Sequence, residues 1–360
     1  MPLSRQLLRN DVLAALKNSI ASGAWKETLP SERQLTERYQ ISRGTLRYAL
    51  KILREEGVLR AIPGSGYRIE RRPNSKPHGS TDISIGVLIG TPQRHRGSHD
   101  SAWLSTLQQR VAKRGWHIHI HDGIPEISRS PSIGLEKLFK ATRHSCWLLV
   151  RCSQETQRVF ESDSVPAIVC GTPFPGVELP SIDIDFRATG RHVAGILAAK
   201  GHRRVGFLCR RSAFPGDEAL FEGFKEGLAS SPAHPSYKKI RYASQNNDFG
   251  SVLSQVTQSE DPITGVFIDC PFRYLGLFTQ ALKAGVRVPD DLSLISRYDS
   301  DFLNFLRPEP ARYHYDPKKM AHKIHSELES RIQGDTLRSK RSVILPDYQP
   351  GASVSLAPSG

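Results

Sequence analysis

The sequence predicts two domains: a small N-terminal domain of helices that ends in a β-hairpin, and a larger α/β domain with parallel sheets in two lobes. Two observations carry this prediction. Residues 1–78 hold 15 Lys and Arg against 7 Asp and Glu, a net charge of +8 out of +14 for all 360 residues. From Ile83 onward, short apolar runs alternate with helical patterns, which favours crossover units and parallel sheets.

The domain boundaries follow from composition. Residues 1–70 form the basic N-terminal domain. Residues 71–82, RRPNSKPHGSTD, hold two prolines, a glycine and no large apolar side chain, so they are typical of a linker. Residues 83–350 form the larger domain, and at about 265 residues two lobes are favoured over one. Residues 351–360 are assigned to a tail.

Two helices are predicted in the N-terminal domain. Ser31 precedes ERQLTERY and is a suitable N-cap, and Ser42 likewise precedes RGTLRYALKILREEG. In the second helix the apolar side chains share one face, while the cationic and hydroxyl side chains point largely elsewhere. The apolar face consists of Leu46, Leu50 and Leu53.

A hairpin follows the second helix. Gly57 ends that helix, and residues 58–61 and 67–69 can pair as strands around the turn 63–66, Pro-Gly-Ser-Gly. Two helices at a sharp angle followed by a small β-wing form a winged helix-turn-helix, the arrangement that places a helix in the major groove of DNA.

The side chains of this unit suit DNA. Guanidinium groups at Arg43 and Arg47 can bind phosphate, or the O6 and N7 atoms of guanine bidentately. Thr45 can bond a phosphate or touch a thymine methyl group. At the wing tip, Gly64 and Gly66 let backbone N–H groups approach the phosphates closely. The alternative is an ordinary helix with solvated arginines, which the whole helix–turn–helix–wing spacing disfavours.

Residues 29–69 resemble the winged helix-turn-helix of the GntR (gluconate-repressor) family. The four matching elements are Leu29–Arg33, the run Ser42-Arg43-Gly44-Thr45-Leu46-Arg47, Glu56-Gly57, and Gly64-Ser65-Gly66. The resemblance implies double-stranded DNA as partner, and we expect the contacts at Arg33, Ser42, Arg43, Thr45, Arg47, Gly64, Ser65 and Gly66. Gly44 departs from the family, which often has a hydroxyl or larger residue there, and this puts one contact in doubt.

The larger domain resembles the effector domain of the lactose/galactose-repressor family, which has the fold of periplasmic sugar-binding proteins. The matching stretches are residues 182–208, 285–300 and 308–317, and the resemblance covers nearly all of 83–350. It implies a small-molecule effector, with carbohydrate as a candidate class. The effector would bind between the two lobes, at the carboxyl ends of the strands.

The polar ligand residues of that family are only partly kept. Asp299 stands where the family has a ligand-binding aspartate, but four positions depart from the pattern: Gly171, Phe186, Leu220 and the pair Cys270-Pro271. A pocket that lost these groups would bind a sugar poorly. Three hypotheses stay open. The ligand is unusual, or Gln93, Arg94, Asp269 and Arg273 replace the missing polar groups, or the domain binds no small molecule.

Several classes of protein are disfavoured. No apolar run reaches the ~18–20 residues that span a bilayer, and the N-terminus does not resemble a signal peptide. Five widely spaced cysteines without a Cys-x-x-Cys pair argue against a disulfide framework and a zinc site, and fit the cytoplasm. Catalytic motifs are lacking, so we expect neither an enzyme nor a cofactor.

One further pattern is the alternation of His117, His119 and His121 with isoleucines. On a strand these imidazoles would project from one face at ~6.5–7 Å spacing. They could share a metal only with help from a second element, so a polar-faced strand near an edge or a cleft is favoured, and no metal site is predicted.

The sequence therefore predicts a homodimeric transcription regulator, more specifically a repressor, whose two winged helices read a palindromic operator and whose affinity is modulated by an effector. Two alternatives stay open. The large domain could serve only for dimerisation. Less consistent with the motifs is a small-molecule-binding protein whose basic domain contacts other proteins.

Overall fold

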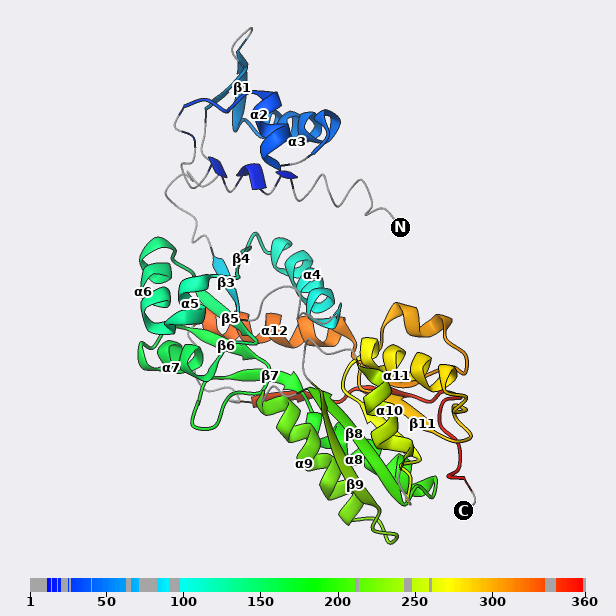
Figure 1. Ribbon diagram of the computed structural model, residues 1–360. Helices are drawn as coiled ribbons and strands as arrows, with labels where there is room; N and C mark the ends of the chain where they lie inside the picture. Colours follow the sequence, from blue (N-terminus) through cyan, green and yellow to red (C-terminus); the bar gives the residue numbers. More distant parts are fainter. Residues whose placement is uncertain are drawn as a thin grey trace. The chain divides into compact units, whose positions relative to one another are not determined.

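The structure is a computed structural model in which the chain forms two compact units, Met1–Thr81 and Asp82–Gly360 (Figure 1). The residues that it describes are 12–13, 15–17, 19–20, 25, 27–39, 41–62, 66–70, 83–90, 98–210, 214–242, 248–258, 261–333 and 341–358.

The first unit has the predicted winged helix. Its elements are α2 (Glu32–Tyr39), α3 (Arg43–Glu55), β1 (Leu59–Ile62) and β2 (Gly66–Ile69). Strands β1 and β2 pair antiparallel, and a bridge between Thr28 and Arg68 extends this small sheet. Its core includes Leu35, the predicted apolar face of α3, and Val12, Leu16 and Ile20 from the preceding segment.

Both predicted helix starts are confirmed. Ser31 Oγ accepts from Gln34 N at 3.3 Å while Gln34 Oε1 accepts from Ser31 N at 3.0 Å, a reciprocal capping box. Ser42 Oγ accepts from Thr45 N at 3.1 Å. At the other end of α3, Gly57 has φ +69°, a left-handed conformation that glycine adopts without steric cost.

The second unit contains two six-stranded sheets within the described residues, which define its two lobes. The sheet of the first lobe has the order β13-β7-β6-β5-β3-β4, and all its pairs are parallel. Its strands are β3 (Ser84–Ile89), β4 (His117–Asp122), β5 (Cys146–Val150), β6 (Ala167–Cys170), β7 (Ser181–Ile184) and β13 (Arg341–Ile344).

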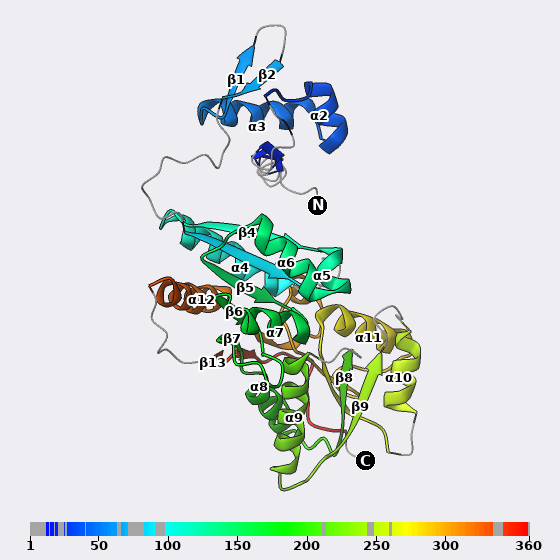
Figure 2. The ribbon, with the colours of Figure 1, turned by 90° about the vertical axis from the view of Figure 1, so that its left-hand side faces the viewer.

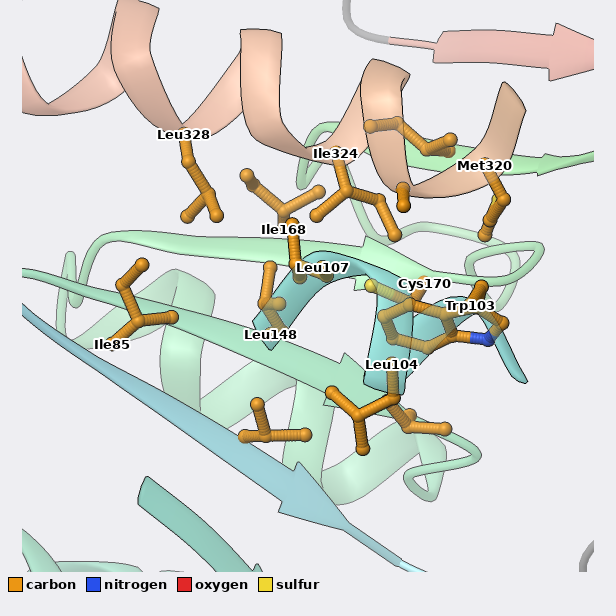
Figure 3. Close-up of a cluster of buried hydrophobic side chains, with 14 of the residues drawn as sticks. Ile85, Trp103, Leu104, Leu107, Leu148, Ile168, Cys170, Met320, Ile324 and Leu328 are labelled. Atoms are coloured by element: carbon orange, nitrogen blue, oxygen red, sulfur yellow. The ribbon is translucent and has the colours of Figure 1, made fainter. Parts of the chain in front are cut away.

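Helices cover both faces of this sheet. On one face lie α4 (Ser98–Ala112) and α12 (Pro317–Ile332), and Figure 3 shows Met320, Ile324 and Leu328 of α12 pointing toward the strands. The other face is covered by α5 (Pro125–Arg129), α6 (Pro131–Ala141) and α7 (Gln154–Ser162). Because both faces are covered, the inner strands β5 and β6 are buried and continuously apolar, whereas the edge strand β4 alternates histidine with isoleucine.

The sheet of the second lobe has the order β14-β12-β11-β10-β8-β9, parallel except for the edge pair β12–β14. Helices α8 (Phe186–Ala199) and α9 (Pro215–Ala229) cover one face, and α10 (Phe249–Thr257) and α11 (Pro271–Lys283) the other (Figure 2). Its strands are β8 (Arg204–Arg210), β9 (Ser236–Tyr242), β10 (Gly265–Ile268), β11 (Ser293–Ser296), β12 (Ala311–His314) and β14 (Asp347–Gln349).

The chain passes between the lobes three times within the described residues: from β7 to α8, from β12 to α12, and from β13 to β14. The elements thus form the two-lobed α/β fold that the sequence predicts. Residues 351–358, assigned above to the start of a tail, pack against the second lobe: the buried Ser353 Oγ donates to Leu294 O at 2.6 Å and accepts from Ala311 N at 2.8 Å. No described helix is long and apolar enough to cross a membrane.

Candidate nucleic-acid interface and effector cavity

The exposed face of α3 presents the predicted DNA-binding side chains. Arg43 is the first residue of the helix and is exposed, and Thr45 lies half-buried in the first turn. The hydroxyl of Ser42 is occupied by the backbone N–H of Thr45 and lies 2.9 Å from the Thr45 hydroxyl. Ser42 therefore fixes the start of the helix, and through it the direction in which Arg43 leaves the backbone.

Two of the predicted arginines pair with carboxylates of α2. Arg47 Nε donates to Glu32 Oε2 at 3.0 Å, although 69% of the Arg47 side chain stays exposed. Arg33 Nε lies 3.5 Å from Glu37 Oε1, with both side chains largely exposed. Exposed pairs of this kind are weak, so both guanidinium groups can exchange their carboxylate for a phosphate.

The wing is described only in part. Gly66, at the start of β2, has φ +92° and is exposed, consistent with a turn that requires glycine. Gly64 and Ser65 lie outside the described residues. At Gly44, an added Cβ would find its nearest neighbour, Ser42 Oγ, at 3.8 Å, so a side chain fits there without steric conflict.

The second candidate site is a cavity of about 130 Å³ that is lined by both lobes. The first lobe contributes Trp103, Arg151, Cys152, Gln157, Val169, Cys170, Gly171, Thr172, Asp183, Ile184, Pro317 and Met320, and the second contributes Phe186, Arg210, Phe214, Gly216, Asp217, Arg297, Tyr298, Tyr315 and Asp316. Many of these residues stand at or just after the carboxyl ends of the parallel strands, where open α/β sheets bind ligands.

A buried ion pair lies at this cavity. Arg297, 3% exposed, donates to Asp217 Oδ1, and Arg210 Nε lies 3.8 Å from Asp217 Oδ2. Burial alone would raise the pKa of Asp217, but the guanidinium groups of Arg297 and Arg210 outweigh it and hold the pKa below its usual value. The Arg297 guanidinium also stacks on the ring of Phe186, 4.1 Å from its centroid.

A second carboxylate, Asp183, is buried in the first lobe. It accepts from the hydroxyl of Thr172 and from Ile184 N at 2.8 Å. Burial raises the pKa of Asp183 to about 6, even though both hydrogen bonds favour the charged form. This carboxylate therefore titrates close to neutrality, as cavity-lining acids often do.

Of the sequence-predicted effector residues, Asp269, Arg273 and Asp299 are described and are not in the lining of this cavity. Asp269 accepts from the Tyr242 hydroxyl at 2.8 Å and from Arg210 N at 3.0 Å, and Arg273 stacks on the Tyr242 ring. Asp299 accepts from Arg312 Nε at 2.9 Å, and its other oxygen lies 3.2 Å from His314 Nδ1. Gln93 and Arg94 lie outside the described residues.

Among the departures from the family pattern, Phe186 and Gly171 do line the cavity, while Leu220 is buried in the core of the second lobe. The three lining arginines are not among the residues predicted from the sequence. Each directly follows an apolar strand-like run, namely CWLLV before Arg151, VGFLC before Arg210 and LSLIS before Arg297. An arginine directly after an apolar strand is therefore the sequence signal that could have identified these cavity residues.

The histidines of β4 do acquire a partner from a second element. His144, which precedes β5, lies with its Nε2 atom 2.9 Å from His121 Nε2, and its ring centroid is 5.4 Å from that of His119. Gly86 of β3 makes room for this cluster, because a Cβ there would meet His144 Cδ2 at 2.6 Å. Among the described residues, no three potential ligands are placed to hold a metal ion.

Fold and site together define a winged helix-turn-helix joined to a two-lobed domain of the ligand-binding type. Comparison with protein families agrees. Residues 8–69 match the model described as bacterial regulatory proteins, gntR family, and residues 180–354 match that of the periplasmic binding protein-like domain. The chain thus combines a GntR-type helix-turn-helix domain with a periplasmic-binding-protein-like domain.

The chain is also similar to characterised regulators. It is 27% identical to the HTH-type transcriptional repressor CytR of Escherichia coli K12 over 150 residues, 41% of this chain and 44% of CytR. The chain thus spans less than half the length of this relative. It is 23% identical to the repressor PurR of Haemophilus influenzae over 290 residues, 77% of this chain and 82% of PurR.

Solved structures show the same fold. A putative LacI transcriptional regulator from Bacillus cereus subsp. cytotoxis matches with a TM-score of 0.67 at 14% identity, covering 76% of this chain and 99% of that one. The complex of the transcriptional regulator CelR with cellobiose matches with a TM-score of 0.65 at 16% identity, covering 95% of this chain and 98% of CelR.

Proposed function

We propose that this protein is a sequence-specific DNA-binding transcription regulator whose operator affinity is modulated by a small molecule in the cavity between the lobes. The observation that carries the first half is the capped helix α3, which presents Arg43 and Arg47 to solvent beside the wing of a strongly basic domain. Phosphate contacts would supply affinity, and contacts to base edges would supply specificity.

The DNA contacts we propose are Arg33, Ser42, Arg43, Thr45, Arg47 and the wing residues 64–66. A homodimer would bring two such helices to the half-sites of a palindromic operator. Repression is the mode that the CytR and PurR relatives support, since both are named as repressors. We place this activity in the cytoplasm, where DNA and reduced thiols coexist.

The first experiment is selection of genomic DNA fragments by the full-length protein at about physiological salt, with unrelated DNA as competitor. Enrichment of a short palindrome supports a sequence-specific regulator, and the neighbouring genes indicate its targets. Binding should weaken steeply as salt rises, because counterions are released from the DNA. Weak binding that is insensitive to sequence would contradict the proposal.

Substitution then locates the interface. Arg43→Ala should lower operator affinity about 5- to 150-fold, since a bidentate base contact contributes about 1–3 kcal/mol. Arg54→Ala is the matched control, because Arg54 is an exposed arginine in the last turn of the same helix. Equal affinity of the wild type and Arg43→Ala would remove α3 as the reading helix.

For the second half of the proposal, the cavity lining is the candidate effector site. Asp269 does not line the cavity, but it accepts a hydrogen bond from the backbone N–H of the lining residue Arg210. Asp299 stabilises β12 by accepting from Arg312. Carbohydrate is a candidate ligand class, since the CelR structure is a cellobiose complex. Ligand-dependent thermal stabilisation, together with a changed operator affinity, tests this half.

A further inference from the structure

The formal charges that line the cavity balance one another. Asp217 accepts from Arg297, and its Oδ2 atom lies 3.8 Å from Arg210 Nε. The Arg151 guanidinium also acts on the Asp217 carboxylate and helps to lower its pKa. A charged ligand group would therefore have to compete with these pairs for a counter-charge. The lining holds three arginines and three aspartates, namely Arg151, Arg210, Arg297, Asp183, Asp217 and Asp316.

Other polar side chains of the lining are bound within the protein. The Thr172 hydroxyl donates to the Asp183 carboxylate. The side-chain amide of Gln157 donates to Cys152 O at 3.3 Å and accepts from Phe174 N at 3.1 Å. A ligand with many hydroxyl groups would displace these hydrogen bonds or leave its own hydroxyl groups unpaired, and both outcomes weaken binding.

Apolar and aromatic side chains from both lobes also line the cavity. On the first lobe, Figure 3 shows Trp103, Cys170 and Met320 close together at the carboxyl end of β6. The second lobe adds the rings of Phe186 and Phe214. A molecule in the cavity would thus contact apolar surface of both lobes, which is the typical arrangement of a small-molecule site. The further members of this set are Val169, Ile184, Tyr298 and Tyr315.

The cavity has the size of a single ring. Its volume is about 130 Å³, and an apolar cavity of about 150 Å³ accepts a benzene molecule. Aromatic rings prefer tilted or offset contacts with other rings. Phe214 already makes a tilted contact with Phe174, with 6.5 Å between the ring centroids. An aromatic ligand ring therefore matches the lining in both size and chemistry.

We propose that the effector is an uncharged compound with a single aromatic ring and few hydroxyl groups, held between Trp103 and Met320 of the first lobe and Phe186 and Phe214 of the second. This class differs from carbohydrate. It agrees with Gly171 and Phe186, two departures from the polar pattern of the sugar-binding family that both line the cavity. The inference rests on the proposed function, because it specifies the ligand of the same cavity.

The test compares neutral aromatic, charged aromatic and carbohydrate probes on the full-length protein. The neutral aromatic probes are benzyl alcohol and acetophenone, the charged one is benzoate, and the carbohydrates are glucose and cellobiose. Dissociation constants are measured by titration calorimetry and ligand-observed NMR. At least one neutral aromatic probe should bind about tenfold more tightly than benzoate and than both carbohydrates, because only this class leaves the paired polar groups undisturbed.

Variants place the binding in the cavity. Phe214→Ser removes a partly buried ring from the lining, and Cys170→Met fills part of the cavity with a longer side chain. Each should weaken binding of the neutral aromatic probe about fivefold or more. The matched controls are Phe305→Ser and Cys270→Met, since Phe305 is 83% exposed, Cys270 is partly exposed, and neither lines the cavity. Both controls should keep the wild-type affinity.

The outcomes separate this inference from the proposed function. The inference is overturned if benzoate or a carbohydrate binds as tightly as the neutral aromatic probes, if neither aromatic probe binds saturably, or if the cavity variants keep the wild-type affinity. Operator binding, measured on the same preparations without any probe, tests the proposed function independently. A carbohydrate that binds and changes operator affinity would support the proposed function and overturn the inference.

Discussion

Arg47 of α3 and Glu32 of α2 form an ion pair, with 3.0 Å between Nε and Oε2, that joins the two helices at their exposed side. The hydroxyl of Tyr67 in the wing lies 3.5 Å from the other oxygen of the same carboxylate. A proposed DNA-reading side chain is thus oriented by a residue that precedes it by fifteen positions, and the wing shares that orienting group.

This relationship predicts the effect of Glu32→Gln. The fold should be retained, because a largely exposed ion pair contributes about 0–1 kcal/mol. Arg47 should lose its fixed direction, so the ratio of operator affinity to competitor affinity should fall several-fold while non-specific affinity does not fall. Both affinities are measured at one salt concentration. A Glu32→Gln protein with unchanged discrimination would show that Glu32 does not orient Arg47 for base contact.

Gly44 and Gly57 predict opposite responses to the same substitution. Gly44 lies in the first turn of α3 with space for a Cβ, so Gly44→Ala should stabilise the winged helix by roughly 0.5 kcal/mol. Gly57 has φ +69°, so Gly57→Ala should destabilise it by about 1 kcal/mol. Amide hydrogen exchange of α3 measures both. Stabilisation by Gly57→Ala would contradict the left-handed turn.

Most of the fold could be predicted because local signals agree with it. Ser31 and Ser42 cap the helices that they were expected to cap, and apolar runs became the buried parallel strands. Helices α9 and α11 begin at Pro215 and Pro271. Proline is favoured in the first turn of a helix, so both starts carry a local signal in the sequence.

The cavity was less predictable for a physical reason. Its arginines come from three separate strands of both lobes, and only the folded sheets bring Arg151 next to Arg210 and Arg297. Residues transferred from the family pattern, such as Asp299, instead formed hydrogen bonds within the second lobe. Sequence position predicts which strand end a residue occupies, but not which neighbour neutralises it.

The packing of residues 351–358 predicts that they stabilise the second lobe. Ser353 is fully buried and its hydroxyl both donates to and accepts from the backbone of adjacent strands. Ser353→Ala should lower the free energy of unfolding by about 1–3 kcal/mol, since two buried backbone groups lose a partner. Ser355→Ala is the milder comparison, because Ser355 is only partly buried. Equal urea midpoints for the Ser353→Ala protein and the wild type would contradict this assignment.

The histidine cluster predicts a loss of stability in acid. Burial and the neighbouring His121 and His119 lower the pKa of His144 to about 4. The unfolded chain, with a histidine pKa near 6.5, then binds the proton more tightly than the native protein. Stability should therefore be complete above about pH 6.5 and decrease as the pH falls toward 4.

His144→Gln tests this linkage. The groups that face His144 are Ser84, His119, His121 and Trp147. None of these four is a carboxylate that could neutralise a protonated His144. The variant should show a smaller decrease of unfolding free energy between pH 6.5 and 4.5 than the wild type. His117→Gln, at the exposed start of β4, should keep the wild-type slope. An identical slope in His144→Gln would assign the acid sensitivity to other groups.

The buried pair of Asp217 and Arg297 predicts a non-additive double substitution. Asp217→Asn leaves a guanidinium that is 3% exposed without its counter-charge, which should cost about 3–5 kcal/mol. Adding Arg297→Met removes that charge, so the double variant should regain most of the loss. Asp290→Asn, in the exposed pair with Arg287, should change stability by less than about 1 kcal/mol.

Urea denaturation at pH 7 compares the wild type, Asp217→Asn, Arg297→Met, the double variant and Asp290→Asn. The double variant should unfold near the wild-type midpoint. Additive effects of the two substitutions would contradict this prediction, because they would show that Asp217 and Arg297 do not neutralise each other. Arg210 would then be the residue that neutralises Asp217.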